Sequence, residues 1–156
     1  MWKILIFAAL TKQIQKAENE GRKITDVLST YDLRYLNRLY EQENKQESFN
    51  ALNITYLKTL TTQVQNGDNV MEILRPSCLK DLNTLFSQNT AMSETLLRLN
   101  RTYLTMLNKQ IQEVKIATQL TGSRLKRLNK LFQRSQDQQI QDLLRQINAK
   151  MESAQG

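Results

Sequence analysis

The sequence predicts an all-α protein, an elongated antiparallel helical bundle of four to five helices with coiled-coil-like packing. Four glycines and one proline among 156 residues leave few turns, so the elements should be few and long. Apolar residues recur at spacings of three and four, the period of one helix face. The hydrophobic fraction of 40% and the charged fraction of 24% suit a packed helical core with a polar surface.

The expected architecture is a single helical domain over residues 1–156, which opens with an apolar-start helix over residues 1–20. Residues 2–10 are apolar on every side of a helix apart from Lys3. Such a segment suits either a helix start buried in the bundle or against a partner, or a membrane segment such as a signal or anchor. It reaches only the lower limit of a signal core of about 7–15 residues, and no A-x-A cleavage pattern follows. Gly21 is expected to end the helix in a left-handed conformation.

A second, long helix is expected over residues 24–66. Its apolar residues keep the helical spacing on both sides of residues 41–48, a segment that contains no apolar residue. We interpret 41–48 as a solvent-exposed part of the same helix, with a loop as the alternative. Gly67 is expected to end this helix in a left-handed conformation.

Residues 69–121 predict a short helix followed by a long one. Asn69 and Glu72 match a capping box, in which the first residue caps the new helix. Pro76 disfavours helical geometry at the residue before it and should therefore end the short helix. The apolar stripe of the long helix then continues until Gly122, another expected cap residue.

Residues 123–152 predict a basic amphipathic C-terminal helix with Ser123 as its N-cap. Nine basic residues and one acid lie between residues 95 and 136, so this region carries +8 while the whole chain carries +7. Four cations of the helix advance by steps of 3, 3 and 4, which places them on one face. The predicted basic face comprises Arg124, Arg127, Lys130 and Arg134, with Arg98 and Arg101 on the preceding helix.

A basic face can be simply the solvated side of a packed helix, or it can bind an anionic partner. Such a partner can be an acidic protein groove, an anionic membrane surface or a nucleic acid. Nucleic acid is not favoured, because neither a zinc-finger spacing nor an aromatic RNA-binding motif accompanies the charge. Partners of this protein are therefore expected to be proteins or further copies of the chain.

A second candidate interface interleaves tyrosine with arginine at Tyr31, Arg34, Tyr35 and Arg38. Both residue types are enriched at protein interfaces, since each joins a large apolar body to a polar end. The alternative is that the tyrosines lie at the edge of the core with their hydroxyls in water.

The sequence predicts no catalytic, cofactor-binding or metal-binding residues, no cofactor, and therefore no enzyme. The chain contains no histidine, the commonest general base and metal ligand. Cys78 is the single cysteine, which excludes an internal disulfide and leaves open a disulfide to another molecule. Glycine-rich nucleotide-binding motifs and the G-x-S-x-G motif of hydrolases are both missing from the sequence.

The short apolar N-terminus, the glutamine-rich helices and the segment Leu120-Thr121-Gly122-Ser123-Arg124 resemble the minor pilus subunits of type IV secretion and conjugation machines. The resemblance implies an envelope, periplasmic or membrane-associated location rather than the cytoplasm, and it transfers no functional residue. We therefore expect a non-enzymatic helical interaction or assembly protein, a subunit of a larger complex. The alternative is a basic nucleic-acid-associated protein that binds phosphates non-specifically through residues 95–136.

Overall fold

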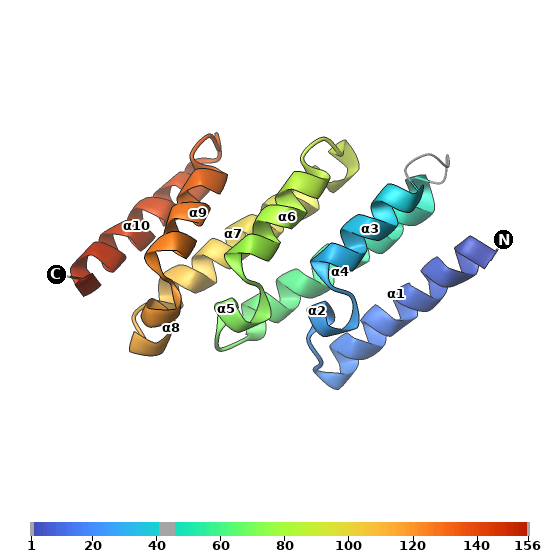
Figure 1. The fold of residues 1–156 in the computed structure, drawn as a ribbon, viewed down its shortest axis with the longest axis horizontal. Coiled ribbons are helices and arrows are strands. Elements are labelled where there is room, and N and C mark those ends of the chain that lie inside the picture. Colours follow the sequence, from blue (N-terminus) through green and yellow to red (C-terminus); the bar gives the residue numbers. More distant parts are fainter. Residues whose placement is uncertain (1, 41–45, 156) are drawn as a thin grey trace. The chain divides into compact units, whose positions relative to one another are not determined.

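The computed structural model describes residues 2–40 and 46–155, with side chains described for residues 8–39 and 49–154. Helices joined by short turns make up this part of the chain, with ten α-helices rather than the expected four to five, one short 3₁₀ helix and no strand, which confirms the all-α class (Figure 1). In chain order the helices are α1 (Trp2–Glu20), α2 (Ile24–Val27), α3 (Thr30–Tyr40), α4 (Gln46–Asn66), α5 (Val70–Ile73), α6 (Pro76–Phe86), η1 (Thr90–Met92), α7 (Ser93–Gln110), α8 (Val114–Gln119), α9 (Gly122–Phe132) and α10 (Gln138–Gln155).

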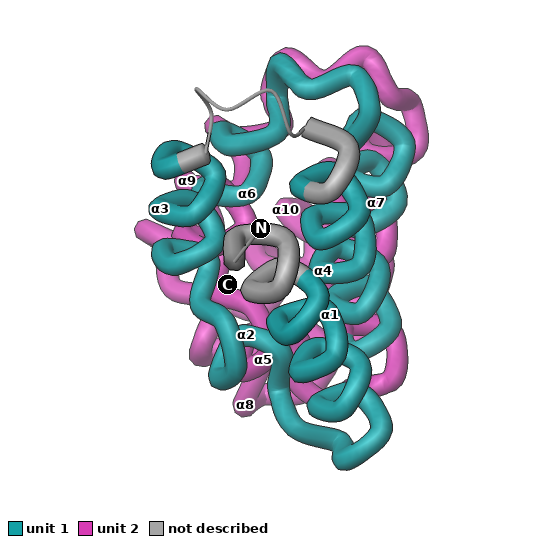
Figure 2. The backbone as a smooth tube through the Cα atoms, turned by 90° about the vertical axis from the view of Figure 1, so that its right-hand side faces the viewer, with its two compact units in different colours: residues 1–63, 81–99 teal, residues 64–80, 100–156 magenta. Residues whose placement is uncertain are grey.

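The chain forms two compact units, coloured separately in Figure 2. Unit 1 contains residues 1–63 and 81–99, and unit 2 contains residues 64–80 and 100–156. Each unit has its own buried apolar residues. They include Ile14, Leu33, Tyr56, Leu60 and Leu82 in unit 1, and Leu74, Leu79, Tyr103, Leu107 and Ile147 in unit 2. The expectation of one domain over residues 1–156 stays a prediction.

The first helix occupies the expected range and ends as its glycine predicted. Gly21 has φ 70°, the left-handed conformation that glycine adopts without steric cost. The Arg22 N–H donates to the Ala17 carbonyl over 2.9 Å, and the Gly21 N–H donates to the Glu18 carbonyl over 3.2 Å. These two bonds form a Schellman motif, which satisfies carbonyls left open at the end of α1.

The prediction of one continuous helix over residues 24–66 was wrong at Leu28. This residue is extended, with φ −146° and ψ 107°, and its N–H closes α2 by donating to the Ile24 carbonyl over 2.9 Å. The Ser29 hydroxyl then accepts from the Asp32 N–H over 3.0 Å at the start of α3. Apolar spacing alone could not reveal this break, because the spacing continues through it without glycine or proline. Of the uncertain segment 41–48, residues 46–48 begin α4 and residues 41–45 lie outside the described residues.

The predicted start of the short helix after Asn69 is confirmed, whereas the predicted role of Gly67 was wrong. The single long helix predicted up to residue 121 was also wrong, because this region is divided into α6, η1, α7 and α8. The Asn69 side chain accepts from the Met71 N–H over 3.0 Å and so caps α5. Pro76 is the first residue of α6, where its missing N–H costs no helical hydrogen bond. Among the glycines described, only Gly21 has a positive φ. Gly67 therefore does not provide a left-handed cap.

The C-terminal region differs from the predicted single helix over residues 123–152. Thr121, rather than Ser123, caps α9 by accepting from the Arg124 N–H over 3.3 Å, and Gly122 is the first residue of that helix. The helix ends at Phe132, and α10 begins after Asp137, whose carboxylate accepts from the Ile140 N–H over 3.0 Å. The side chains of Thr121 and Asp137 therefore set the starts of α9 and α10.

A three-part pattern recurs along the chain with a period of about 46 residues. Each repeat consists of a one- or two-turn helix, an 11-residue helix and a long helix. The three 11-residue helices α3, α6 and α9 start at residues 30, 76 and 122. The short helix before each ends at a buried leucine, namely Leu28, Leu74 and Leu120. A period of 40–47 residues is typical of helical repeats with two or three helices.

The same period is visible in the sequence of the 11-residue helices. Residues 33–40, 79–86 and 125–132 share the pattern Leu, Arg or Lys, any residue, Leu-Asn, any residue, Leu, and then Tyr or Phe. Helical spacing alone does not reveal this repeat, because every amphipathic helix has that spacing. The repeat becomes visible only when residues 46 positions apart are compared. Fold and sequence therefore identify the chain as three tandem helical repeats that follow α1.

Equivalent hydrogen bonds recur in the first two repeats, at offsets of 45–47 residues. In the first repeat the Gln63 amide accepts from the Ile24 N–H over 2.9 Å and donates to the Arg22 carbonyl over 2.6 Å. In the second, Gln110 accepts from the Val70 N–H over 2.7 Å and donates to the Gly67 carbonyl over 3.1 Å. In each of these two repeats, one glutamine of the long helix thus holds the start of the short helix, by satisfying backbone groups that a helix end leaves open.

An asparagine pair joins the second and third helices of a repeat. Asn37 on α3 and Asn53 on α4 exchange two amide bonds of 3.2 and 3.0 Å. Asn129 on α9 and Asn148 on α10 do the same over 2.9 and 2.7 Å. The equivalent positions of the middle repeat also hold asparagines, Asn83 and Asn100. The asparagine of the repeated sequence pattern is therefore a structural residue.

Candidate interaction surfaces

Helix α3 carries exposed large side chains along one line. Tyr31, Tyr35 and Leu39 follow one another at steps of four residues, and 66%, 55% and 51% of their respective surfaces are exposed. Residues four apart lie on the same helix face. Together with Arg34 and Arg38 between them, they form what we call the α3 stripe.

The α3 stripe brings together all four residues of the predicted tyrosine–arginine interface. The Arg34 guanidinium lies 5.9 Å from the centre of the Tyr31 ring, within the range of a cation–π interaction. Arg38 is exposed. Sequence reasoning missed Leu39, although the four-residue step from Tyr31 and Tyr35 would have included it.

The tyrosines of the α3 stripe have no counterpart in the other repeats. At the position of Tyr31 the second and third repeats have Ser77 and Ser123, and at the position of Tyr35 they have Asp81 and Arg127. The 11-residue helix therefore forms equally well with small or charged residues at these positions. Two exposed aromatic rings are a property of α3 itself and not a requirement of the repeat.

The predicted basic face is partly neutralised by the fold. The Arg101 Nε donates to Asp137 Oδ2 over 3.1 Å, and its Nη2 contacts the same oxygen. The hydrogen bond from Arg101, together with the backbone N–H of Ile140, holds the pKa of the Asp137 carboxyl below its usual range. Arg101 is therefore an internal ion-pair partner of the residue that caps α10, and the prediction that it contributes to a free basic face was wrong.

Two further cations of the predicted basic face, Arg124 and Arg98, differ from the others in bonding and in location. The Arg124 Nη1 donates to the Gln119 carbonyl over 2.7 Å, so part of its hydrogen-bonding capacity is used at the end of α8. Arg98 is exposed on α7 and belongs to unit 1, whereas the other five predicted residues belong to unit 2. Arg98 is therefore described apart from the cations of unit 2.

The remaining cations form one exposed group, which we call the α9 cation row and which consists of Lys126, Arg127, Lys130 and Arg134. Arg134 lies in the turn directly after α9, and the other three lie on the helix. Within the described residues, none of the four pairs with a carboxylate. The predicted site omitted Lys126. This residue occupies the Arg or Lys position of the repeated pattern, so the repeat would have identified it.

The side of α9 opposite these cations is buried. Leu128 is fully buried and Phe132 is 3% exposed. The helix is thus held in unit 2 by its apolar side, and the α9 cation row faces solvent. Basic and apolar side chains therefore lie on different sides of α9, which is shorter than the predicted range 123–152.

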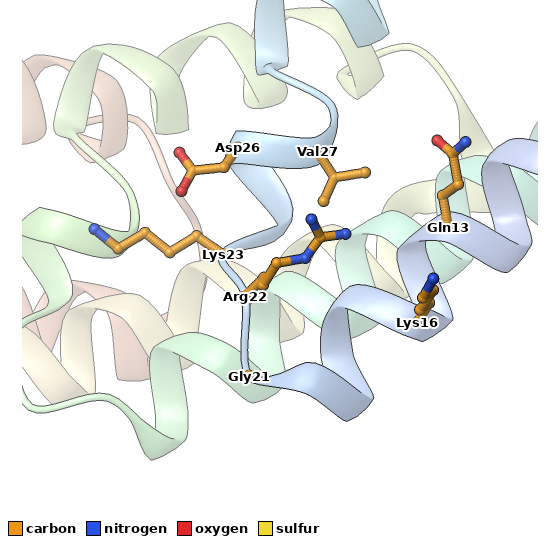
Figure 3. Close-up of a pocket in the computed structure, with 7 residues that line it drawn as sticks. All are labelled: Gln13, Lys16, Gly21, Arg22, Lys23, Asp26 and Val27. Carbon is orange, nitrogen blue, oxygen red and sulfur yellow. The ribbon is translucent and has the colours of Figure 1, made fainter.

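A hollow of about 620 Å³ lies where α1 turns into α2 (Figure 3). Three cations line it, but Lys16 and Arg22 each form an ion pair with Glu20, over 3.8 and 3.2 Å. Figure 3 shows that the charged ends of Lys16, Arg22 and Lys23 point in different directions and do not converge on one point. The hollow is therefore not organised to hold an anion.

Other chemistry has little support in the described part of the chain. No group of three or more metal-ligating side chains occurs there. Cys78 is a half-buried free thiol on α6. None of the helices in the described ranges combines the length and apolar character needed to cross a membrane. The two interpretations of the N-terminus, a buried helix start or a membrane segment, depend on the side chains of residues 2–7, which lie outside those described.

The segment that carries the resemblance to minor pilus subunits coincides with a repeat junction. Leu120 ends α8 and Thr121 caps α9, as Leu28 and Leu74 end the short helices of the earlier repeats. The leucine of this segment is therefore explained by the repeat. Comparison of the chain with protein-family models, curated proteins and solved structures gives no match.

Proposed function

We propose that this protein is a non-enzymatic helical interaction or assembly protein, a subunit of a larger complex, which binds a protein partner through the α3 stripe. One observation carries the proposal. Tyr31 and Tyr35 are more than half exposed at positions where the other repeats have serine, aspartate or arginine. Because the fold does not need these rings, their role is best sought outside the chain.

The chemistry of the α3 stripe supports a protein partner. Tyrosine and arginine are the residues that most often dominate binding energy at protein interfaces, and they act best in patches from which water is excluded. The rings offer a large contact area with few rotatable bonds, so little conformational entropy is lost on binding. Arg34 and Arg38 favour a partner surface that combines apolar pockets with carboxylates.

The architecture within each unit supports a scaffold. We infer that consecutive long and 11-residue helices pack antiparallel with coiled-coil-like contacts, as expected for an elongated bundle. In support, the Asn37–Asn53 pair joins α3 to α4 and the Asn129–Asn148 pair joins α9 to α10. A frame held in this way would present the α3 stripe on a rigid helix. The envelope context remains part of the proposal and is supported by the resemblance that the short apolar N-terminus, the glutamine-rich helices and residues 120–124 carry.

The test compares three forms of the chain in its native cell. Tyr31→Ser with Tyr35→Arg gives α3 the residues that the third repeat has at these positions, so the fold should be kept. Val114→Ser is the matched control, because it removes another exposed apolar side chain, 81% exposed on α8. Proteins crosslinked to each form are identified and quantified by mass spectrometry.

We expect the wild type and Val114→Ser to capture the same defined set of proteins. The amount captured by the tyrosine variant should be at least about tenfold lower. A tenfold loss corresponds to about 1.4 kcal/mol, less than one interface hot spot contributes. If the lost protein is the chain itself, sedimentation of purified protein should show self-association that the tyrosine variant abolishes. Equal capture by all three forms would refute the role of the α3 stripe.

A further inference from the structure

We infer that the α9 cation row binds the phosphate backbone of a nucleic acid, without sequence preference. The proposal concerns unit 2 and is independent of the α3 stripe, which belongs to unit 1. It rests on four exposed cations and on the fact that the apolar side of their helix is already packed.

Comparison among the repeats shows that the fold does not require these charges. At the positions of Arg127 and Lys130 the second repeat has Asp81 and Thr84. Helix α6 therefore keeps a single cation, Lys80, whose charge Asp81 balances, whereas α9 contains four cations and no acid. The same 11-residue helix is thus compatible with no net charge, and the positive charge is specific to α9.

At the N-terminal end of α9, the placement of charge also opposes the stability of the isolated helix. Its first turn contains no acidic residue and contains Arg124, although the N-terminus of a helix carries a partial positive charge that favours anions. Neighbouring cations on the helix also repel one another, and each such pair lowers helix stability by a small amount. A bound polyanion would relieve both repulsions, so these terms favour the liganded state.

The exposed side of α9 favours a phosphate backbone over a protein or a membrane. A protein interface needs an apolar or aromatic anchor at its centre, and within the described residues the exposed large apolar side chains are Tyr31, Tyr35, Leu39 and Val114. None of them lies on α9. Membrane-binding amphipathic helices insert their apolar side into the lipid, but Leu128 and Phe132 are buried in the protein. Contacts to phosphate need only charge.

The number of cations sets the expected salt dependence. Neutralising four phosphates of a duplex gives a slope of about −3.6 for the logarithm of the association constant against the logarithm of salt concentration. Base-reading motifs are missing from the sequence, so affinity should not depend on base order.

The experiment is a titration of a fluorescent mixed-sequence DNA duplex with the full chain, followed by anisotropy over a range of salt concentrations. Arg127→Gln with Lys130→Gln and Arg134→Gln should reduce the slope by about three, one for each contact. It should also weaken binding at low salt at least about tenfold. Lys12→Gln with Lys58→Gln and Lys80→Gln is the matched control, since it removes the same net charge from exposed positions on α1, α4 and α6.

Several outcomes would overturn the proposal. They are no binding by the wild type at low salt, an equal loss in the control variant, or tighter binding to phosphatidylserine vesicles than to the duplex. The last result would assign the α9 cation row to a membrane surface. The variant with Tyr31→Ser and Tyr35→Arg should bind the duplex like the wild type, so failure of the α3 stripe and failure of this site are distinguishable.

Discussion

The hydroxyl of Tyr56 on α4 donates a hydrogen bond of 2.7 Å to the carbonyl of Leu28, the residue that ends α2. One repeat later, Tyr103 on α7 donates a bond of 2.9 Å to the carbonyl of Leu74, which ends α5. Both tyrosines are fully buried. The long helices α4 and α7 therefore each supply the partner for a carbonyl that a helix end leaves open in the interior of the protein.

Tyr103→Phe should lower the free energy of unfolding by about 1–3 kcal/mol. The ring would still fill its place in the core, but the Leu74 carbonyl would lose its bond from the hydroxyl while buried. Urea denaturation of both proteins measures the difference. Burial raises the pKa of the Tyr103 hydroxyl well above its usual value, so the group is a neutral donor throughout the usable pH range.

The matched control is Tyr31→Phe, which removes the hydroxyl of an exposed tyrosine. Its unfolding free energy should lie within about 0.5 kcal/mol of the wild type. If both variants lost the same stability, the Tyr103–Leu74 bond would not be the cause.

The Asn129–Asn148 pair should show thermodynamic coupling. Replacing either residue by alanine leaves the amide of the other without its partner, at a cost of about 1 kcal/mol or more. The double variant should be more stable than the sum of the single losses predicts, by at least about 0.5 kcal/mol. Denaturation of the four proteins in a double-mutant cycle gives this value, and strictly additive losses would contradict a direct interaction.

Two glycines should respond in opposite directions to alanine. Gly21→Ala should destabilise the protein by about 1–2 kcal/mol, because φ is 70° at this residue and a Cβ is unfavourable in the left-handed region. Gly122→Ala should stabilise it by about 0.5 kcal/mol, because alanine favours the helical backbone of α9. A Cβ would meet no atom within 4 Å at either position. Thermal unfolding of both variants distinguishes a backbone effect from a steric one.

The Arg101–Asp137 ion pair predicts a pH-dependent contribution to stability. The pKa of Asp137 is lowered in the folded protein, so its contribution is fully present above the unfolded pKa of about 3.9 and is lost as pH falls through the folded value. Asp137→Asn should therefore lower the melting temperature at neutral pH, and its difference from the wild type should shrink below about pH 4.

Melting curves at a series of pH values test this prediction. Asp26→Asn, which changes an exposed carboxylate on α2, should lower the melting temperature little at any pH. A difference between Asp137→Asn and the wild type that stays constant down to pH 2 would show that the side chain acts without its charge.

Local chemistry made several boundaries predictable. Gly21 ends α1, Asn69 caps α5 and Pro76 begins α6, because glycine and proline act through their own backbone preferences and the asparagine side chain bonds to the backbone two residues on. The turn at Leu28 was not predictable in this way, since the bond that holds it comes from Tyr56, 28 residues away. The repeat was present in the sequence as the Leu-Asn pattern, but spacing within single helices does not reveal it.

The sequence by itself determined the helical class, the excess of cations between residues 95 and 136, and the tyrosine–arginine segment, because these depend on composition and on neighbours within one or two turns. Only the tertiary structure decided which of those residues are available to a partner. Arg101 is neutralised by Asp137, 36 residues further along, whereas Arg127, Lys130, Tyr31 and Tyr35 stay exposed. Exposure depends on which segments meet after folding, and contacts between distant segments are not encoded in local spacing.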